Sequence, residues 1–316
     1  MKPKLLLMGA LLPTLPFFFF LSPANAAPSA ADSGAVIKEG TVAEKVLGGF
    51  GQTDGPAFSR LGYLVFSDAP KNTILKYVPT ASKDVFEGGS SGSKPMVTIL
   101  RNNSRGATGL TFDRQGRLIV CETSARRVTR TEKDGSISVL ADRVNGRRLN
   151  GPRDAVHAID GSTYFTDPAP HGTGAVCQIM RDGSVRTVLD AIDRPAGIAL
   201  SANQRFLYLT DGATNQIRVY AVIGDGALVD GRTFATLDSS ANGSAGGIKT
   251  DQSGNVYCAG PGGVWAFDEH GGHLGTITVP EAPASVGWGD DFKTLYVTAG
   301  TSLYKIRLSA SGTRTF

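Results

Sequence analysis

Residues 207–211 read LYLTD, a short apolar run of β-forming residues that ends on a carboxylate. Runs of this kind occur six times, with starts 39 to 54 residues apart. A turn and another short run precede several of them, as in 109–112 (GLTF), and a third run follows most, as in 216–220 (QIRVY). The six runs are 64–68, 118–122, 163–167, 207–211, 256–260 and 295–299. Units of three or four antiparallel strands, repeated every 40 to 50 residues or so, are typical of β-propeller blades, so we predict an all-β, six-bladed β-propeller.

The composition agrees with this fold. Of the 316 residues, 41% are hydrophobic and 19% are charged, so the chain can bury a core and is not intrinsically disordered. Its 40 glycines favour many tight turns between short strands and argue against a helical bundle.

The beginning of the chain has the pattern of a secretory signal peptide. Lys2 and Lys4 precede a largely apolar segment at 5–21, and ANA at 24–26 is a small-x-small cleavage signal. No apolar run long enough to span a membrane follows residue 26. We therefore expect residues 1–26 to be a signal peptide, 27–46 a linker able to lend a strand that closes the ring, and 47–316 the propeller. The mature protein is then periplasmic or secreted, without a membrane span.

The cysteines form neither a redox motif nor a zinc motif. Three is an odd number in an exported chain, so at least one thiol is unpaired or bonded elsewhere. Cys121, Cys177 and Cys258 each lie in an apolar β-like run, where cysteine acts as a small buried hydrophobe. The sequence leaves the state of each thiol open.

Two classes of function lack support. The formal net charge is +4 and no stretch of five or six basic residues occurs, so we expect no nucleic-acid partner. The Gly-x-Ser-x-Gly match at 88–92 lies in a Gly/Ser-rich loop without a helical pattern after it, so it does not predict a nucleophile elbow.

The innermost strands of a propeller line its axis, and their starts meet at one mouth of the channel. The residues at these starts form a predicted axial ring of Asp54, Thr108, Arg153, Ala196, Gly246 and Ser285. Ca²⁺ takes about six to eight oxygen ligands, so a ring with one carboxylate and one guanidinium predicts no metal ion. Either Asp54 and Arg153 form an ion pair that plugs the pore, or Arg153 holds an acidic group of a ligand.

Carboxylates end four of the second strands at the same mouth: Asp68, Glu122, Asp167 and Asp211. Either one of them is a general acid or base with a raised pKa, or each accepts hydrogen bonds from the backbone of a neighbouring loop. His171, in the glycine- and proline-rich loop 167–174, is the histidine that we expect over the mouth.

Several longer motifs resemble one family. They are TFDRQGRLIVCE at 111–122, RRVTR at 126–130, LNGP at 149–152 with YFTDP at 164–168, and TLYVTAGTSLYKIR at 294–307. As a set, over about residues 48–308, they resemble the gluconolactonase, regucalcin (senescence marker protein) and luciferin-regenerating-enzyme family. The resemblance implies a six-bladed propeller that hydrolyses sugar lactones or related esters with one divalent cation, often Ca²⁺, at the axis.

The resemblance also shows where this chain departs from the family. The first-blade Glu-Gly-Pro motif reads Asp54-Gly55-Pro56 here, and the Asn of Pro-Asn-Asp reads Arg153. Three further family positions, two Asn and one Asp, read Thr108, Ala196 and Gly246. Only one acid is kept, so the resemblance implies that the cation has lost most of its protein ligands. Asn150, Asp154, Asp167 and Asp211 are retained and look like supporting and loop positions.

Three hypotheses follow. The first is an exported lactone or ester hydrolase in which Asp54 activates water and Arg153 stabilises the oxyanion or holds a carboxylate. The second is a non-catalytic propeller that binds a small molecule, such as a sugar lactone or an acid, or a protein. The third is metal-free, non-hydrolytic chemistry of strictosidine-synthase-like type, with Glu122 or Asp211 as proton carrier. The candidate catalytic residues are Asp54, Arg153 and Asp211, and the candidate substrate-binding residues are Thr108, Glu122, Asn150, His171 and Ser285.

Overall fold

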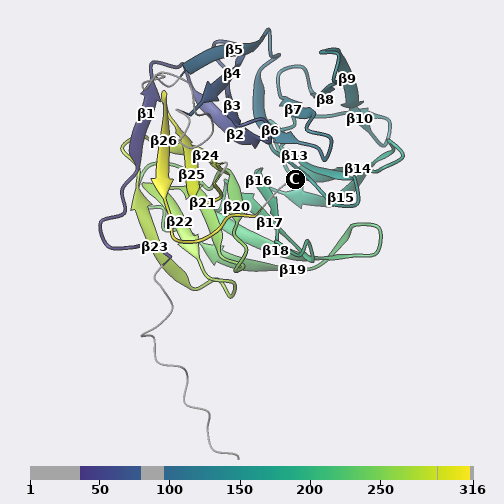
Figure 1. Ribbon diagram of the computed structural model, residues 1–316. Coiled ribbons are helices and arrows are strands. Elements are labelled where there is room, and N and C mark those ends of the chain that lie inside the picture. Colours follow the sequence, from purple (N-terminus) through teal and green to yellow (C-terminus); the bar gives the residue numbers. More distant parts are fainter. Residues whose placement is uncertain (1–35, 80–95, 290, 314–316) are drawn as a thin grey trace, which may run out of the picture. The chain divides into compact units, whose positions relative to one another are not determined.

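The computed structural model describes residues 36–79, 96–289 and 291–313. In this part of the chain the strands form six four-stranded antiparallel sheets and one two-stranded sheet. The six larger sheets stand around a central axis as the blades of a six-bladed β-propeller (Figure 1). The predicted fold class is therefore confirmed. The predicted signal peptide at 1–26 and the Gly/Ser loop at 88–92 lie outside the described residues.

The first three blades follow one another along the chain, each from its innermost to its outermost strand. Blade 1 consists of β2 (Thr53–Ser59), β3 (Tyr63–Asp68), β4 (Thr73–Val78) and β5 (Met96–Asn102). Blade 2 consists of β6 (Ala107–Phe112), β7 (Leu118–Glu122), β8 (Arg127–Thr131) and β9 (Ile137–Ala141). A small hairpin of β10 (Arg143–Val144) and β11 (Arg147–Arg148) comes next. Blade 3 consists of β12 (Ala155–His157), β13 (Thr163–Asp167), β14 (Gly174–Ile179) and β15 (Val185–Ile192).

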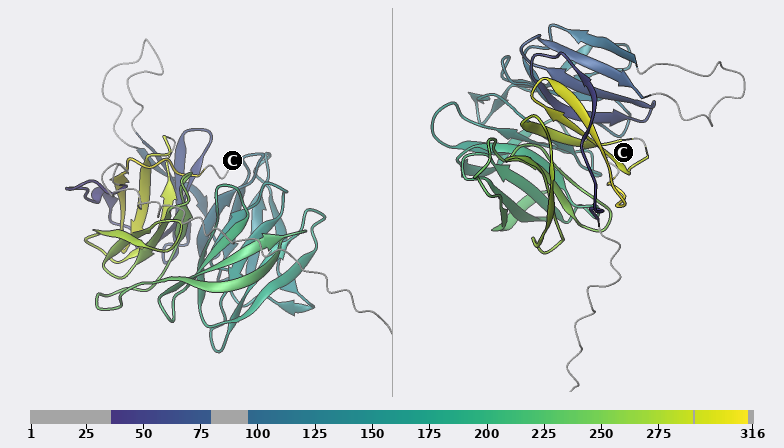
Figure 2. Two further views of the ribbon diagram at one scale, coloured as in Figure 1. Left: turned by 90° about the horizontal axis from the view of Figure 1, so that it is seen from below. Right: turned by 90° about the vertical axis from the view of Figure 1, so that its left-hand side faces the viewer.

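The last three blades repeat this order, with one change in the final blade. Blade 4 consists of β16 (Pro195–Leu200), β17 (Phe206–Asp211), β18 (Gln216–Ile223) and β19 (Ala227–Thr236). Blade 5 consists of β20 (Ile248–Thr250), β21 (Val256–Gly260), β22 (Gly263–Phe267) and β23 (His273–Thr278). Blade 6 takes β24 (Pro283–Trp288), β25 (Thr294–Ala299) and β26 (Ser302–Arg307) from the end of the chain and β1 (Glu44–Gly48) from its beginning. Figure 2 shows the blades from two further sides.

The core is divided into six hydrophobic clusters, one between each pair of neighbouring blades. The second strand of a blade supplies both sides, because successive residues of a strand point to opposite faces. In β3, Leu64 and Phe66 pack toward blade 6, whereas Val65 packs toward blade 2. The apolar runs in the sequence are therefore continuous because both faces of these strands are buried.

The ring is closed by β1, which pairs antiparallel with β26 from Glu44 opposite Lys305 to Gly48 opposite Ser302. Lys45 on β1 also forms an ion pair with Glu281, at 3.3 Å. This strand spans position 46/47, at which we drew the boundary between linker and propeller. The first and last ordered strands of the propeller thus belong to one sheet.

The innermost strands approach one another so closely that glycine is required. Gly55 has a φ of 55°, and a Cβ atom on it would lie 2.2 Å from the carbonyl oxygen of Thr108. A Cβ atom on Gly109 would lie 2.5 Å from the carbonyl oxygen of Arg153. Contacts this short place the residues of neighbouring blades side by side at the axis.

All three cysteines are free and buried. Their burial agrees with their apolar runs, whereas the sequence had left the state of the thiols open. Cys121 and Cys177 lie in the cluster between blades 2 and 3, and Cys258 lies in the cluster between blades 4 and 5. Within the described residues, no helix is long and apolar enough to cross a membrane.

Candidate functional site

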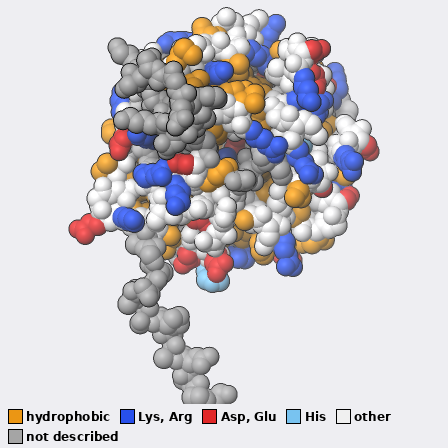
Figure 3. Space-filling view, in the orientation of Figure 1, with side chains coloured by type: hydrophobic (Ala, Val, Ile, Leu, Met, Phe, Trp, Pro, Cys, Tyr) orange, Lys and Arg blue, Asp and Glu red, His pale blue; other side chains and the backbone are white. Residues whose placement is uncertain are grey.

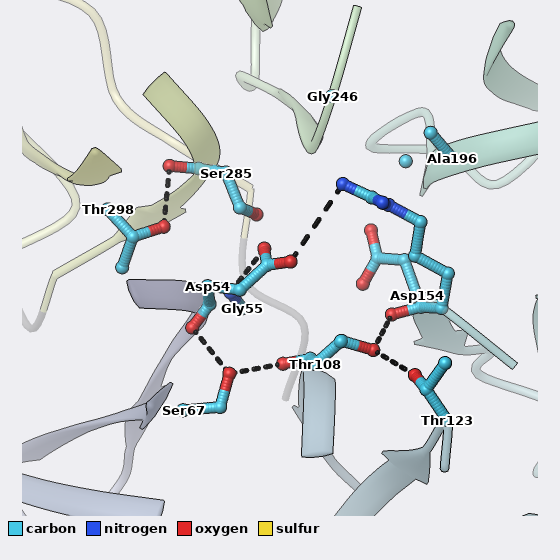
Figure 4. Close-up of polar contacts among 12 residues, drawn as sticks. Asp54, Gly55, Ser67, Thr108, Thr123, Asp154, Ala196, Gly246, Ser285 and Thr298 are labelled. Atoms are coloured by element: carbon cyan, nitrogen blue, oxygen red, sulfur yellow. Dashed lines mark hydrogen bonds and ion pairs between the residues drawn. The ribbon is translucent and has the colours of Figure 1, made fainter. Parts of the chain in front are cut away.

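The axial ring surrounds the end of the channel at which the innermost strands begin (Figure 4). Asp54, Thr108 and Ala196 are each the second residue of their strand, β2, β6 and β16. Figure 4 shows these side chains around one opening, together with Gly246 and Ser285. We call this end of the channel the mouth.

Asp54 and Arg153 face each other across the mouth. The Oδ2 atom of Asp54 lies 3.9 Å from the Nη2 atom of Arg153, and the two side chains are 17% and 40% exposed. This distance is longer than a hydrogen bond between charged groups, which is about 2.7–2.9 Å. The other carboxylate oxygen of Asp54 accepts a hydrogen bond from the backbone N–H of Gly55 (2.8 Å). One oxygen of Asp54 and the guanidinium of Arg153 therefore retain hydrogen-bonding capacity toward the opening.

Hydroxyl groups bind the backbone carbonyls of Pro152 and Arg153. The Oγ1 atom of Thr108 lies 2.7 Å from the carbonyl oxygen of Arg153 and 2.8 Å from the Oγ1 atom of Thr123. Thr123 donates in turn to the carbonyl of Pro152 (2.7 Å). Thr108, a predicted substrate-binding residue, thus uses its hydroxyl to position the loop that carries Arg153.

The same kind of contact recurs around the axis. At four junctions between blades, a hydroxyl of one blade donates to the carbonyl of the ring residue of the next, and we call this set the hydroxyl belt. The pairs are Ser67 with Thr108 (2.9 Å), Thr108 with Arg153 (2.7 Å), Thr166 with Ala196 (2.8 Å) and Thr210 with Gly246 (2.8 Å). The belt fixes the ring positions relative to one another and occupies one lone pair of each of these carbonyls.

A second carboxylate lies behind the ring. Asp154 is 5% exposed, and its two oxygens accept hydrogen bonds from the backbone N–H groups of Ala155 (2.9 Å) and Ile198 (3.2 Å). Burial raises the pKa of the Asp154 carboxyl, the ammonium of Lys249 opposes this effect, and the charge of Asp54 adds to it. Asp154 therefore links blades 3 and 4 and lies within electrostatic reach of both Asp54 and Lys249.

Our sequence analysis treated Asp154 as a supporting position and did not single out Lys249. A signal for Asp154 was present, because the ring residue is followed by glycine in blades 1, 2, 4 and 5 and by aspartate in blade 3. A carboxylate in place of a glycine that packs at the axis indicates a polar group inside the channel.

Three of the second-strand carboxylates cap loops of their own blades. Asp211 accepts hydrogen bonds from the backbone N–H groups of Arg194 (3.2 Å) and Ala213 (2.9 Å). Asp167 accepts from Asn150 and Gly151, and Asp68 accepts from the loop before β2 in the same way. Each holds the loop that leads into the innermost strand. For Asp211, these contacts agree with the second of the two alternatives from the sequence, in which the carboxylate accepts hydrogen bonds from the backbone of a neighbouring loop.

Glu122, the carboxylate at the same position of blade 2, has different partners. It is fully buried, forms ion pairs with Arg101 and Arg127, and accepts a hydrogen bond from Thr129 (2.7 Å). These partners lie on β5 and β8, outside the axial ring. The structure therefore brings together Asp54, Thr108 and Arg153 and places Glu122 in an internal ion-pair network.

The other three predicted substrate-binding residues, Ser285, Asn150 and His171, lie in different environments. Ser285 is 2% exposed, and its Oγ atom occupies the space where a side chain on Gly247 would begin. The backbone N–H of Asn150 is bonded to Asp167, and the residue is half-buried. His171 is exposed on the loop after β13, which ends at the mouth.

Residues 52–301 match the family described as SMP-30/Gluconolactonase/LRE-like region. The chain belongs to this family. The match covers all six blades apart from the closing strand and the end of blade 6, and it confirms the resemblance carried by the sequence motifs.

Two similar proteins are named gluconolactonases. One, from Zymomonas mobilis, is 27% identical over 303 residues, which cover 88% of this chain and 84% of the relative. A solved gluconolactonase structure from Xanthomonas campestris is 27% identical with a TM-score of 0.76, covering 87% of this chain and 92% of that one.

A more distant structure shares the fold alone. Regucalcin from Agrobacterium tumefaciens, described as a calcium-binding protein, is 15% identical with a TM-score of 0.68 and covers 84% of this chain and 92% of its own. The propeller scaffold is thus shared with a protein of much lower sequence identity.

The ring can be tested for its fit to the divalent cation that the family resemblance implies. Asp54 offers a single carboxylate, and one of its oxygens is bonded to Gly55. Ala196 and Gly246 offer no side-chain oxygen, and Arg153 brings a positive charge to 3.9 Å from the carboxylate. Calcium sites take about six to eight oxygen ligands with carboxylates among them, so this donor set does not fit the ion.

Proposed function

We propose that this protein is an exported lactone hydrolase in which Asp54 and Arg153 replace the divalent cation of the family. The observation that carries the proposal is the guanidinium of Arg153, 3.9 Å from the Asp54 carboxylate at the place where the resemblance puts the cation. A fixed positive charge at this point can stabilise an oxyanion, as a bound metal ion does.

The geometry supports a single-base hydrolysis. The Oδ2 atom of Asp54 takes a proton from a water molecule, whose oxygen attacks the lactone carbonyl. The N–H groups of Arg153 stabilise the negative charge that forms on the carbonyl oxygen. When the ring C–O bond breaks, the protonated Asp54 returns its proton to the departing oxygen. The product is an open-chain hydroxy acid, and the enzyme regains its starting state.

The substrate class comes from family membership and from the relatives, two of which are named gluconolactonases. We therefore propose a sugar lactone or a related ester as the substrate. The carboxylate that opens from the lactone would remain within reach of Arg153, because guanidinium groups bind carboxylates well.

The deciding experiment is hydrolysis of a panel of sugar lactones by the purified protein, with and without EDTA. We expect turnover above the spontaneous rate that EDTA does not change. Loss of turnover with EDTA and recovery with Ca²⁺ would reject the metal-free mechanism while keeping the hydrolase. Saturable binding of lactones without any turnover would instead favour the non-catalytic propeller.

Export is the second part of the proposal, and the signal-peptide pattern at 1–26 supports it. N-terminal sequencing of the protein from its native cells should give Ala27 as the first residue. Full-length protein in the cell interior would contradict export without affecting the hydrolase proposal.

A further inference from the structure

A cavity lies at the end of the channel opposite the mouth. Its volume is about 750 Å³, within the range of small-molecule sites in proteins. The innermost strand β2 begins at the mouth with Asp54 and reaches this cavity with Phe58, Ser59 and Arg60. Figure 3 shows the face of the propeller seen in Figure 1, on which hydrophobic and basic side chains are interspersed.

The lining is mostly apolar, and aromatic rings supply much of it: Phe58, Phe112, Trp288 and Phe292. Two cationic side chains, Arg60 and Lys249, also line the cavity. The described lining residues include no aspartate or glutamate. An apolar body with one anionic group therefore complements this surface in both shape and charge.

Lys249 is the anchor for such an anion. It lies in the middle of β20, and its Nζ atom donates one hydrogen bond, to the carbonyl of Ile248 (3.0 Å). No carboxylate of the described residues lies within 4.0 Å of this ammonium group. An ammonium group has three N–H donors, so two remain for a ligand.

Asp154 is a buried carboxylate within electrostatic reach of Lys249. Both oxygens of Asp154 accept backbone hydrogen bonds, from Ala155 and Ile198. Asp154 and Lys249 do not form a direct ion pair, so Asp154 leaves the N–H donors of Lys249 available. A half-buried cation in this position gains most from a partner that enters from the cavity.

We propose that this cavity binds an amphipathic monocarboxylate, with its carboxylate on Lys249 and its apolar chain against Phe112 and Trp288. The site is separate from the mouth and does not depend on the function proposed for Asp54 and Arg153. It gives the protein a second ligand, of a chemical class different from a sugar lactone.

Tryptophan fluorescence provides a direct test, because the chain contains two tryptophans and only Trp288 lines the cavity. Trp265 lies on β22 and packs against Phe267 and His273, so Trp265→Phe leaves Trp288 as the reporter. In this variant, octanoate should change the emission saturably. Octan-1-ol, which lacks the charge, should bind about 10- to 100-fold more weakly, the usual scale of a charge-assisted hydrogen bond.

Variants of the anchor complete the test. Lys249→Met, of similar length, should lower the octanoate affinity by about tenfold or more, and Lys249→Arg should retain most of it. The matched control is Lys133→Met, an exposed lysine on the same face that does not line the cavity. Thermal unfolding of each variant shows whether it is folded.

Three results would overturn the proposal. They are the absence of a saturable change in Trp288 emission, equal affinities for octanoate and octan-1-ol, and unchanged octanoate affinity in Lys249→Met.

Discussion

Arg153 and Asp54 lie across the channel from each other, on blades 3 and 1, with 3.9 Å between their charged atoms. Blade 2 lies between them, and its Thr108 is bonded to the backbone of Arg153. The two charges are therefore held apart by the scaffold at a distance that admits a ligand group. The pair is thus a long ion pair, whose 3.9 Å spacing exceeds the length of a charge-assisted hydrogen bond.

The first prediction concerns this pair. Asp54→Asn should lower kcat about 10²- to 10⁴-fold, because the amide cannot take a proton from water. Arg153→Met should lower kcat about 10²- to 10³-fold, the usual cost of losing one oxyanion donor. Steady-state lactone hydrolysis measures both. Arg143→Ala, an exposed arginine on β10, is the control and should leave kcat unchanged; wild-type rates in Asp54→Asn would refute the assignment.

The second prediction concerns Gly246, which stands where the resemblance implies an aspartate. A Cβ atom on Gly246 would lie 2.3 Å from the carbonyl oxygen of Ala284. Gly246→Ala should therefore lower the free energy of unfolding by about 1–3 kcal/mol through overpacking. Gly151→Ala, whose new carbon would meet a methyl group of Thr123 at 3.2 Å, should cost less. Urea unfolding measures the loss in the free energy of unfolding for each variant. Equal losses would contradict the prediction, because they would mean that the backbone at Ala284 moves to accommodate the new carbon.

The third prediction concerns Glu281, next to the closing strand. Partial burial disfavours its charged form, but hydrogen bonds from Ser302, Thr301 and Tyr304 outweigh this and lower the pKa of Glu281 to about 2. Because this pKa is lower than in the unfolded chain, the carboxylate stabilises the fold above the ordinary glutamate pKa of 4.5. That stabilisation is lost as the pH falls from about 4.5 toward 2.

In Glu281→Gln the free energy of unfolding should fall less over this pH range than in the wild type. Denaturant titrations at a series of pH values measure the difference. Glu269→Gln, at an exposed turn, is the control and should follow the wild type. Parallel pH curves for Glu281→Gln and the wild type would contradict the prediction.

The fourth prediction concerns the buried thiols. Burial raises the pKa of Cys177 and of Cys258 to about 12, and it raises the pKa of Cys121 as well. The thiolate is the reactive form, so a thiol reagent at pH 8 should not label the native protein. All three thiols should react in guanidinium chloride. Ser253→Cys, at an exposed turn, supplies a positive control, and native labelling at its rate would contradict the burial of the thiols.

The repeat in the sequence predicted the blades well because each second strand is buried on both faces. The run at 207–211, for example, corresponds to β17 (Phe206–Asp211). The same alignment placed Glu122 and Asp211 at equivalent ends of their strands. It could not distinguish their roles, because the partners of Glu122 are Arg101 and Arg127, which no repeat position marks.

The sequence did not predict the cavity that Lys249 lines. The short strand Ile248–Thr250 shows that the side chain of Lys249 points to the face opposite those of its neighbours. Whether that face meets solvent, a carboxylate or an apolar hollow depends on Phe112 and Trp288, which come from blades 2 and 6. Such a convergence of distant segments is a property of the closed ring and not of any one repeat.

The closure of the ring by β1 has a consequence for synthesis. The partner of β1 is β26, the last strand of the propeller, so β1 has no neighbour while the ribosome makes the blades between them. During that time β1 is an unpaired strand, and the first blade lacks the blade 6 residues against which Leu64 and Phe66 pack. The nascent chain therefore cannot bury the blade 6 side of its first blade before the last blade is made, and a chain that stops short of β26 should remain open and prone to aggregation.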